Sequence, residues 1–400
     1  MTELATLKAV KRDGRDEALL RPAAGLEAEF TLIVDDKPAR PEAVFGDPRG
    51  FLRVPLMHRT GRSFHLPTGA AVYFDTGVIE LATPVMELER GCFARLARSL
   101  DASLTLVREQ LDQWERRSGR RVRLQGFSAH YNVSPRQVGS ASGRAHRFDR
   151  AAWLLAHILP APVMLLATNR ESTGVGVRPR PPRLEVTADY SPDWARIAAT
   201  GAVVGGVVAD VSRWTDLSLD ALRRARIPVI ERFSPCRHTS RRGWLARYDC
   251  YPTNPFACDP DEAIWSTSLG RVSLREIAAA VWLRFERAIT RIADAASLTV
   301  ARRILTGRSE SWLDHAERPQ AYDDVGRTKR EQQESNAIGS SRYERVVLNT
   351  IARRPLRLEG STWIPEAVRG WSRIVLRRED GVRREMPLDA LVPYLQDWGE

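Results

Sequence analysis

The most constraining feature of this chain is the stretch from Gly25 to Phe30, in which two glutamates alternate with apolar residues. In a β-strand successive side chains point to opposite faces, so Glu27 and Glu29 share one face and the apolar residues share the other. The apolar face can cover a core. Two carboxylates about 7 Å apart on the other face repel each other, unless solvent or a cation such as Mg²⁺ lies between them. This segment alone fits either an edge strand with a solvated face or one wall of a metal site.

Three further strand candidates also carry polar pairs: Asp75 with Glu80, His130 with Asn132, and Arg183 with Glu185. We expect a bulge or kink at Thr76-Gly77 to bring Asp75 and Glu80 onto one face, because a straight strand would separate them. If the four strands are neighbours, their shared face is a basin lined with carboxylates, one imidazole and one guanidinium. Buried charges are costly without compensation, and two or three Mg²⁺ ions bridging the phosphates of ATP would supply it.

The rest of the sequence predicts helices that cover the apolar face of this sheet. Apolar residues at helical spacing predict a long helix within Leu88–Arg117, which should lie against the apolar side of the sheet. A helix rich in small residues should follow Ser191 or Asp193 and pack closely on the sheet. Other predicted elements are a strand from Val122 to Val133 with Val122, Leu124, Gly126, Ser128, His130 and Asn132 on one side, a helix over Ala151–Ala167 broken by Pro160 and Pro162, a loop over Asn169–Pro182, and a helix over Ser273–Ala296.

Length and composition favour a main domain with an appendage. Four hundred residues exceed what one small core usually holds. A polar run from Asp323 to Ser341 precedes a segment of the sequence with short β-like runs. We therefore expect a catalytic domain over residues 1–335 and a small C-terminal domain over 342–400. Residues 1–22 are expected to be a mobile lead-in.

Charge and cysteine usage exclude several classes of protein. The net charge of +11 comes almost entirely from arginines that are spread along the chain among 50 acids, so we do not expect nucleic-acid binding. The four cysteines have no CxxC spacing and predict reduced structural thiols, not a zinc site or a disulfide framework. No run of 18 uncharged apolar residues and no apolar signal core occur, so we expect a cytoplasmic protein with no membrane partner.

Four familiar catalytic motifs are missing from the sequence. It contains no GxxxxGK[ST] loop and no GxGxxG after a strand, and it lacks both a GxSxG elbow and an HExxH helix. P-loop, Rossmann, serine-hydrolase and zincin chemistry are therefore unsupported.

In their order along the chain, the polar motifs resemble a known family. Gly25-Leu26-Glu27-Ala28-Glu29-Phe30, then Val72-Tyr73-Phe74-Asp75 before Glu80-Leu81-Ala82-Thr83-Pro84, then His130-Tyr131-Asn132, and finally Arg183-Leu184-Glu185-Val186 are similar to motifs of the carboxylate-amine ligases of the glutamine synthetase-like fold. The likeness is greatest to the family of the prokaryotic ubiquitin-like protein (Pup) ligase and its sister depupylase.

This resemblance implies a fold and a set of roles. It implies an α+β fold: a curved, mainly antiparallel sheet with helices on its convex face, followed by a small C-terminal domain. It also implies ATP and Mg²⁺ as cofactors, and an amide or isopeptide bond formed through an acyl phosphate. The implied metal ligands are Glu27, Glu29, Glu80, His130 and Glu185. Asp75 and Arg183 are the implied catalytic residues, and Arg183, His130 and Asn132 the implied nucleotide contacts.

The resemblance also defines the expected partners and leaves alternatives open. The expected partner is a protein or peptide with a free carboxylate, a small ubiquitin-like modifier being one candidate, together with an amine acceptor. Glu185 stands where the Pup enzymes have His, which is closer to glutamate-cysteine ligases that make small γ-glutamyl amides. The gap from Glu29 to Asp75 is short for the insertion that marks the depupylase, which favours ligation over hydrolysis. A catalytically silent nucleotide-binding relative is the remaining alternative.

Overall fold

The computed structural model describes residues 19–135, 141–238, 242–327, 339–370 and 372–398. Within these residues, twelve strands pair antiparallel in one large sheet. In order across the sheet they are β11 (Cys236–Arg237), β12 (Trp244–Arg247), β9 (Gly174–Arg180), β10 (Arg183–Asp189), β8 (Val122–Ser134), β1 (Ala23–Val34), β6 (Val78–Ala82), β5 (Ala71–Asp75), β4 (Ser63–His65) and β3 (Met57–Thr60), while β2 (Lys37–Ala39) and β7 (Met86–Glu87) also pair with β1.

Strand β1 lies in the middle of the sheet, between β8 and β6. Its apolar residues Leu26, Ala28 and Phe30 are fully buried in the main core, as the alternation predicts. The alternative of an edge strand with a solvated face is therefore wrong. The strand begins at Ala23, two residues before the predicted start.

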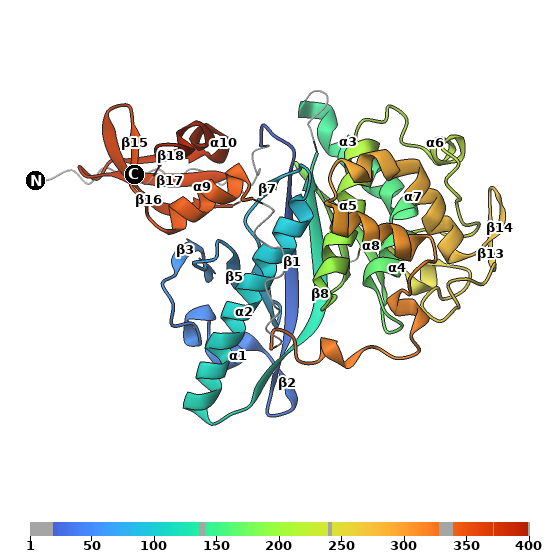
Figure 1. The fold of residues 1–400 in the computed structure, drawn as a ribbon, viewed down its shortest axis with the longest axis horizontal. Coiled ribbons are helices and arrows are strands. Elements are labelled where there is room, and N and C mark those ends of the chain that lie inside the picture. The colour runs from blue at the N-terminus through green and yellow to red at the C-terminus, as the bar shows by residue number, and fades with distance from the viewer. Residues whose placement is uncertain (1–18, 136–140, 239–241, 328–338, 371, 399–400) are drawn as a thin grey trace, which may run out of the picture.

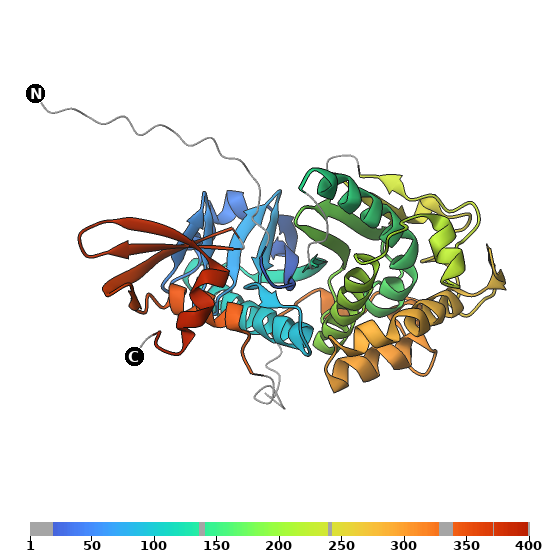
Figure 2. The same ribbon diagram turned by 90° about the horizontal axis from the view of Figure 1, so that it is seen from above.

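Helices cover the apolar face of this sheet. The helices of the described residues are α1 (Pro41–Phe45), α2 (Cys92–Ser118), α3 (Ala141–Ile158), α4 (Pro160–Ala167), α5 (Trp194–Val211), α6 (Leu219–Arg224), α7 (Leu274–Thr290), α8 (Ala295–Leu305), α9 (Arg342–Ile351) and α10 (Leu388–Leu391). Figure 1 and Figure 2 show α2 running along β1, and α4, α5, α7 and α8 gathered beside the half of the sheet that contains β8. This arrangement confirms the predicted α+β fold with a mainly antiparallel sheet.

The small-residue helix α5 packs most closely on other helices. A Cβ atom at Gly201 would lie 2.1 Å from the Phe93 ring of α2, and one at Gly206 would lie 2.7 Å from the Ile289 Cα of α7. The close approach predicted for this helix is thus made to α2 and α7. By length and composition α5 could cross a membrane, but 72% of it is buried inside the protein. The same test is passed by residues 145–158 of α3 together with α4, which are bent by 60° at the break between the two helices.

Two predictions of secondary structure are wrong. The segment predicted as a loop over Asn169–Pro182 contains strand β9, which pairs with both β10 and β12. The Gly, Pro and Arg residues of this segment have weak β propensity, so the local sequence does not predict a strand. Pairing with a strand on each side outweighs that propensity. The helix predicted over Ser273–Ala296 is divided in two, because the Asp294 side chain caps the start of α8.

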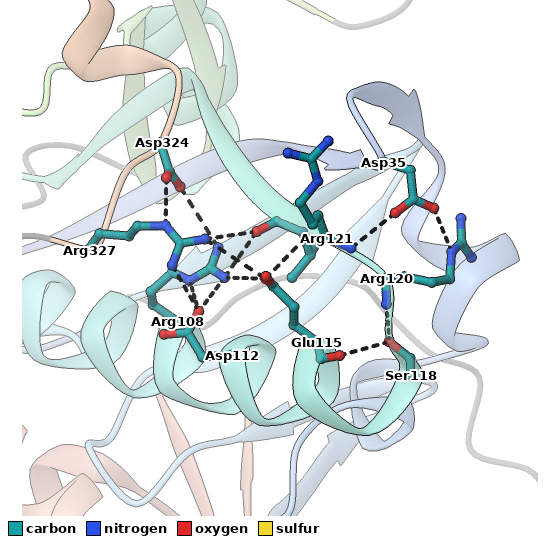
Figure 3. Close-up of polar contacts among 10 residues, drawn as sticks. Asp35, Arg108, Asp112, Glu115, Ser118, Arg120, Arg121, Asp324 and Arg327 are labelled. Atoms are coloured by element: carbon teal, nitrogen blue, oxygen red, sulfur yellow. Dashed lines mark hydrogen bonds and ion pairs between the residues drawn. The ribbon is translucent and has the colours of Figure 1, made fainter.

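A buried arginine joins the segment after α8 to the main domain (Figure 3). Arg108 of α2 is 2% exposed, and its guanidinium lies near the carboxylates of Asp112, Glu115 and Asp324. Arg327 extends the network through its own ion pair with Asp324. The polar run from Asp323 to Ser341 therefore begins with a segment that is tied to α2. Its residues 328–338, like residues 1–18 of the predicted lead-in, lie outside the described part of the chain.

A second sheet forms the C-terminal part of the described chain. It contains β15 (Leu356–Leu358), β16 (Ser361–Arg369), β17 (Arg373–Arg378) and β18 (Arg383–Pro387), with the turn Glu379-Asp380-Gly381 joining β17 to β18. These strands and α9 share a separate hydrophobic core, which also takes in Ala23, Met57 and Val85 from the first part of the chain. The division at residues 335 and 342 stays a prediction.

Candidate active site

The first wall of the site is the pair of central strands β1 and β8. Their register sets Glu27 opposite His130 and Glu29 opposite Ser128, with all four side chains on the face away from the helices. The Nδ1 atom of His130 is 3.4 Å from Glu27 Oε2, and its Nε2 atom is 3.8 Å from Glu29 Oε1. The Ser128 hydroxyl donates to Glu29 at 2.6 Å. These contacts fix two carboxylates and an imidazole as one group.

A β-bulge at Phe127 places His130 on this face. The register changes between Glu29 and Phe30, since Phe30 pairs with Gly126 and Glu29 with Ser128. Phe127 is therefore the extra residue, and it is 56% exposed. The prediction that Val122, Leu124 and Gly126 share a face with His130 and Asn132 is wrong. Before the bulge the even-numbered residues of β8 face the core, and after it they face the site.

The second wall is the hairpin of β5 and β6. Thr76 and Gly77 have φ of 49° and 99°, which gives a tight two-residue turn, and not the predicted kink within one strand. Tyr73 lies opposite Glu80 across the hairpin, and Asp75 is on the same face as Tyr73. Glu80 also pairs directly with Glu29 across β1 and β6. The hairpin thus brings Asp75 and Glu80 to the glutamates of β1.

These walls surround a cavity of about 450 Å³ in the described structure. Seven of the eight predicted site residues line it, Asn132 being the exception. The lining residues are Glu27, Glu29, Arg59, Tyr73, Asp75, Glu80, His130, Arg180, Arg183 and Glu185. Acids occupy the middle of the sheet, and arginines approach from both sides: Arg59 from β3, and Arg180 and Arg183 from β9 and β10.

Two buried acids of the site, Glu27 and Glu80, differ in their protonation. Burial and the negative charge of Glu27 raise the pKa of Glu80 to about 8, and the Tyr73 hydroxyl donates a hydrogen bond to it. Burial also acts to raise the pKa of Glu27, but the hydrogen bond and charge of His130, helped by Arg183, outweigh it and lower that pKa to about 2. For His130, burial acts downward, but the hydrogen bond and charge of Glu27, together with the charges of Glu185 and Glu29, outweigh it and raise its pKa. Without a cation, Glu27 is ionised and Glu80 is protonated at neutral pH.

Two groups of these side chains have the geometry to hold a metal ion. Glu27, Glu80 and His130 form one group, and Glu29, Asp75 and Glu80 form the other. In each group the ligand atoms lie within 4.8 Å of one another. Glu80 belongs to both groups, so two cations held here would share it. Carboxylate oxygens at this density suit hard divalent cations such as Mg²⁺.

Glu185 and Asn132 hold arginines. Both oxygens of Glu185 face guanidinium groups, one forming an ion pair with Arg178 and the other lying 2.7 Å from Arg180 Nε. The buried Asn132 accepts a hydrogen bond from Arg183 Nε at 2.9 Å. Glu185 is in neither cation-binding group of the described residues, and its role as a metal ligand stays a prediction. In this arrangement it holds Arg178 and also Arg180, which lines the cavity.

Four residues of the site were missed from the sequence: Arg59, Tyr73, Arg178 and Arg180. Tyr73 stands two residues before Asp75, so the alternation of the strand could have found it. Arg178 and Arg180 lie in the segment predicted as a loop. Arg59 reaches the cavity from a strand four positions from β1 across the sheet, which only the tertiary fold reveals.

The fold matches that of a solved ligase complex. No protein-family model matches the chain, and none of the curated proteins does. Among solved structures, the complex between the prokaryotic ubiquitin-like protein Pup and its ligase PafA matches over 95% of this chain and 93% of that chain, with a TM-score of 0.51 and 12% sequence identity. At this identity the likeness shows the fold alone, and it confirms the predicted Pup-ligase-like architecture at that level.

Proposed function

We propose that this protein is an ATP- and Mg²⁺-dependent carboxylate-amine ligase that forms an amide or isopeptide bond. The observation that carries the proposal is the convergence of Glu27, Glu29, Asp75, Glu80 and His130 from four strands on one cavity with arginines at both ends. A fold shared with a Pup ligase supports it. A purely structural sheet would have no reason to concentrate buried acids in this way.

The residues present fit divalent cations. Burial and the negative charge of Glu27 raise the pKa of Glu80 to about 8, and a cation between the two carboxylates would offset both effects. We assign Glu27, Glu80 and His130 to one cation and Glu29 with Glu80 to a second, and we reserve the neighbouring Asp75 for proton transfer. When bound, Mg²⁺ and ATP supply the phosphoryl group that converts a substrate carboxylate into an acyl phosphate.

The side chains of this protein have distinct tasks in such a reaction. Asp75 is the base, since an attacking amine must lose a proton and Asp75 lies beside the turn of the β5–β6 hairpin, where it is only partly buried. Arg180 and Arg183 bind phosphate oxygens, and Glu185 and Asn132 hold their guanidinium groups in place. We expect the substrate to be a protein or peptide in the cytoplasm, in keeping with the Pup ligase that shares the fold.

The decisive experiment combines binding and turnover. ATP should bind in the presence of Mg²⁺ and not of EDTA, and ADP should be released when a peptide carboxylate and a candidate amine are both added. Glu27→Ala should abolish the Mg²⁺-dependent binding, while the exposed Glu109→Ala on α2 serves as the matched control.

The other outcomes distinguish the alternatives. ATP that binds but never turns over with any acceptor would identify a silent relative, and cleavage of an isopeptide with ATP left intact would identify a hydrolase. Turnover with free glutamate and small amines would identify a γ-glutamyl ligase. The sequence argument for that last class was Glu185 as a metal ligand, and the two arginines that bind Glu185 weaken it.

A further inference from the structure

The candidate for a second reactive site is a pair of cysteines at the edge of the large sheet. All four cysteines are free thiols in this structure, as the sequence predicts. Cys236 lies on β11, and Cys250 ends a short helical turn (Tyr248–Cys250) that follows β12. Both thiols reach the same acceptor, since each Sγ lies 3.6 Å from the carbonyl oxygen of Leu245. The two sulfurs therefore cannot be separated by more than twice that distance.

The surrounding backbone holds the two cysteines in adjacent segments. Cys236 pairs with Leu245 in the antiparallel β11–β12 ladder. The amide of Ser234, two residues before Cys236, donates to the Cys250 carbonyl at 3.3 Å. Phe233 and Tyr251, just outside the pair, stack with ring centroids 4.3 Å apart. Burial and the neighbouring Cys250 thiol raise the pKa of Cys236. Both side chains are partly exposed, so small oxidants can reach them.

The other two cysteines have different surroundings. Cys92 is fully buried at the start of α2, where burial raises its pKa to about 12. The thiol of Cys258 donates to its own local backbone at Asn254, 3.2 Å away. Among the described residues neither contacts a second thiol, so Cys258, which is also partly exposed, provides a matched control.

We propose that Cys236 and Cys250 form a reversible intramolecular disulfide that ties β11 to the segment following β12. The oxidant is a low-molecular-weight disulfide. One thiolate attacks its S–S bond, forming a mixed disulfide and expelling one thiolate, and the second cysteine then displaces the other half. Two protons from the cysteines end on the two released small thiols, and one S–S bond replaces another.

This disulfide would lie behind the arginine wall of the cavity. Gly243, at the start of the β12 arm, approaches Arg178 so closely that an added Cβ would lie 2.8 Å from Arg178 Cγ. Arg178 in turn forms the ion pair with Glu185. Oxidation would therefore fix the hairpin that supports these two residues. The proposal stands on the cysteine geometry and does not depend on the ligase assignment.

The test uses the full chain and oxidised glutathione at a pH of about 8.5, where more of each thiol is ionised. We expect wild-type protein to lose two of its four free thiols without gaining mass from bound glutathione, and to recover both with dithiothreitol. Cleavage after arginine places Cys236 in residues 233–237, but places Cys250 and Cys258 together in residues 248–271. The Cys258→Ser variant removes that ambiguity, and it should still link residues 233–237 to 248–271.

Variants that lack one cysteine of the pair should stop at the mixed disulfide with glutathione. Cys236→Ser and Cys250→Ser should each retain one glutathione on the remaining partner. A wild-type chain that keeps four thiols, that holds a stable glutathione adduct, or that links Cys258 instead would overturn the proposal. Because the thiol count is made on wild-type protein and the peptide map on Cys258→Ser, a Cys236 or Cys250 variant that fails to fold does not affect the decision.

Discussion

At the residue scale, Glu80 is the group whose protonation most directly reports a cation. Its pKa of about 8, raised by burial and by Glu27, exceeds the ordinary 4.5. A carboxyl group with a raised pKa favours the folded state at low pH, so the metal-free protein should lose this contribution to stability as the pH rises from about 4.5 through 8. A bound cation requires the ionised form of Glu80, so cation binding should restore the stability that is lost at higher pH.

We therefore predict that Mg²⁺ binding at pH 7 releases a proton from Glu80. Below pH 8 the apparent affinity for Mg²⁺ should weaken about tenfold per pH unit, because protons compete with the metal. Calorimetric titration in buffers with different ionisation enthalpies measures the number of protons released. The Glu80→Gln variant should release about one proton fewer than wild type. Equal proton release by the two proteins would remove Glu80 from the cation site.

A second prediction concerns Asp75, the proposed base. The Asp75→Asn variant keeps the size of the side chain but cannot accept a proton, so we expect ATP binding within about threefold of wild type and a loss of turnover of 10²-fold or more. ADP release under saturating ATP and amine measures the loss. The exposed Glu109→Gln variant controls for removal of a charge. Product formation at the wild-type rate would eliminate the proposed role.

A third prediction separates the two cationic ends of the cavity. Within the described structure the buried Nε atom of Arg59 has no hydrogen-bond partner, and its guanidinium lies 5.7 Å from the Tyr73 ring centroid. Arg59→Ala should raise the KM for the carboxylate substrate about tenfold or more and leave the Kd for ATP unchanged. Arg180→Ala should raise the Kd for ATP about tenfold or more and leave the KM for the carboxylate substrate unchanged. Arg62→Ala, on the exposed turn after β3, is the control and should change neither constant.

At the element scale, the alternation of β1 and β10 could be predicted because each strand keeps a strict two-residue period. The bulge at Phe127 and the turn at Thr76-Gly77 could not be placed so well, since a two-residue period gives no sign of where a strand gains a residue or reverses. Strand β9 was missed because its pairing with β10 and β12 is a long-range contact. The acidic side chains of the site were found from local patterns, and its arginines mostly were not.

A prediction at this scale tests how α5 packs. Replacing a glycine inside a helix by alanine normally raises the free energy of unfolding by about 1 kcal/mol. At Gly206 the new Cβ would lie 2.7 Å from Ile289 Cα and 2.8 Å from its amide nitrogen, backbone atoms that cannot rotate away. We expect Gly206→Ala to lower the free energy of unfolding by about 1–3 kcal/mol. Urea denaturation measures this, with Gly339→Ala in open space as the control. A stabilised Gly206→Ala protein would mean that α5 and α7 are less closely packed.

At the scale of the whole molecule, the C-terminal sheet is joined to the main sheet next to the candidate site. Buried Glu87 of β7 accepts hydrogen bonds from the Ser341 hydroxyl and from the Tyr343 amide, and it forms an ion pair with Arg342 at 3.1 Å. Strand β16 also packs against β3, the strand that carries Arg59. The position of Arg59 at the cavity therefore depends on how the C-terminal sheet docks.

The last prediction follows from this connection. Glu87→Ala removes the acceptor for three groups at the junction, so we expect a loss of about 3 kcal/mol in unfolding free energy. Hydrogen exchange should rise first in residues 342–398, before the β1–β8 centre is affected. Because Arg59 would then be held less firmly, the KM for the carboxylate should rise while ATP binding, which depends on Arg180 and Arg183, stays close to wild type. If exchange rises uniformly, or if both constants change together, the C-terminal sheet does not act on the site through β3.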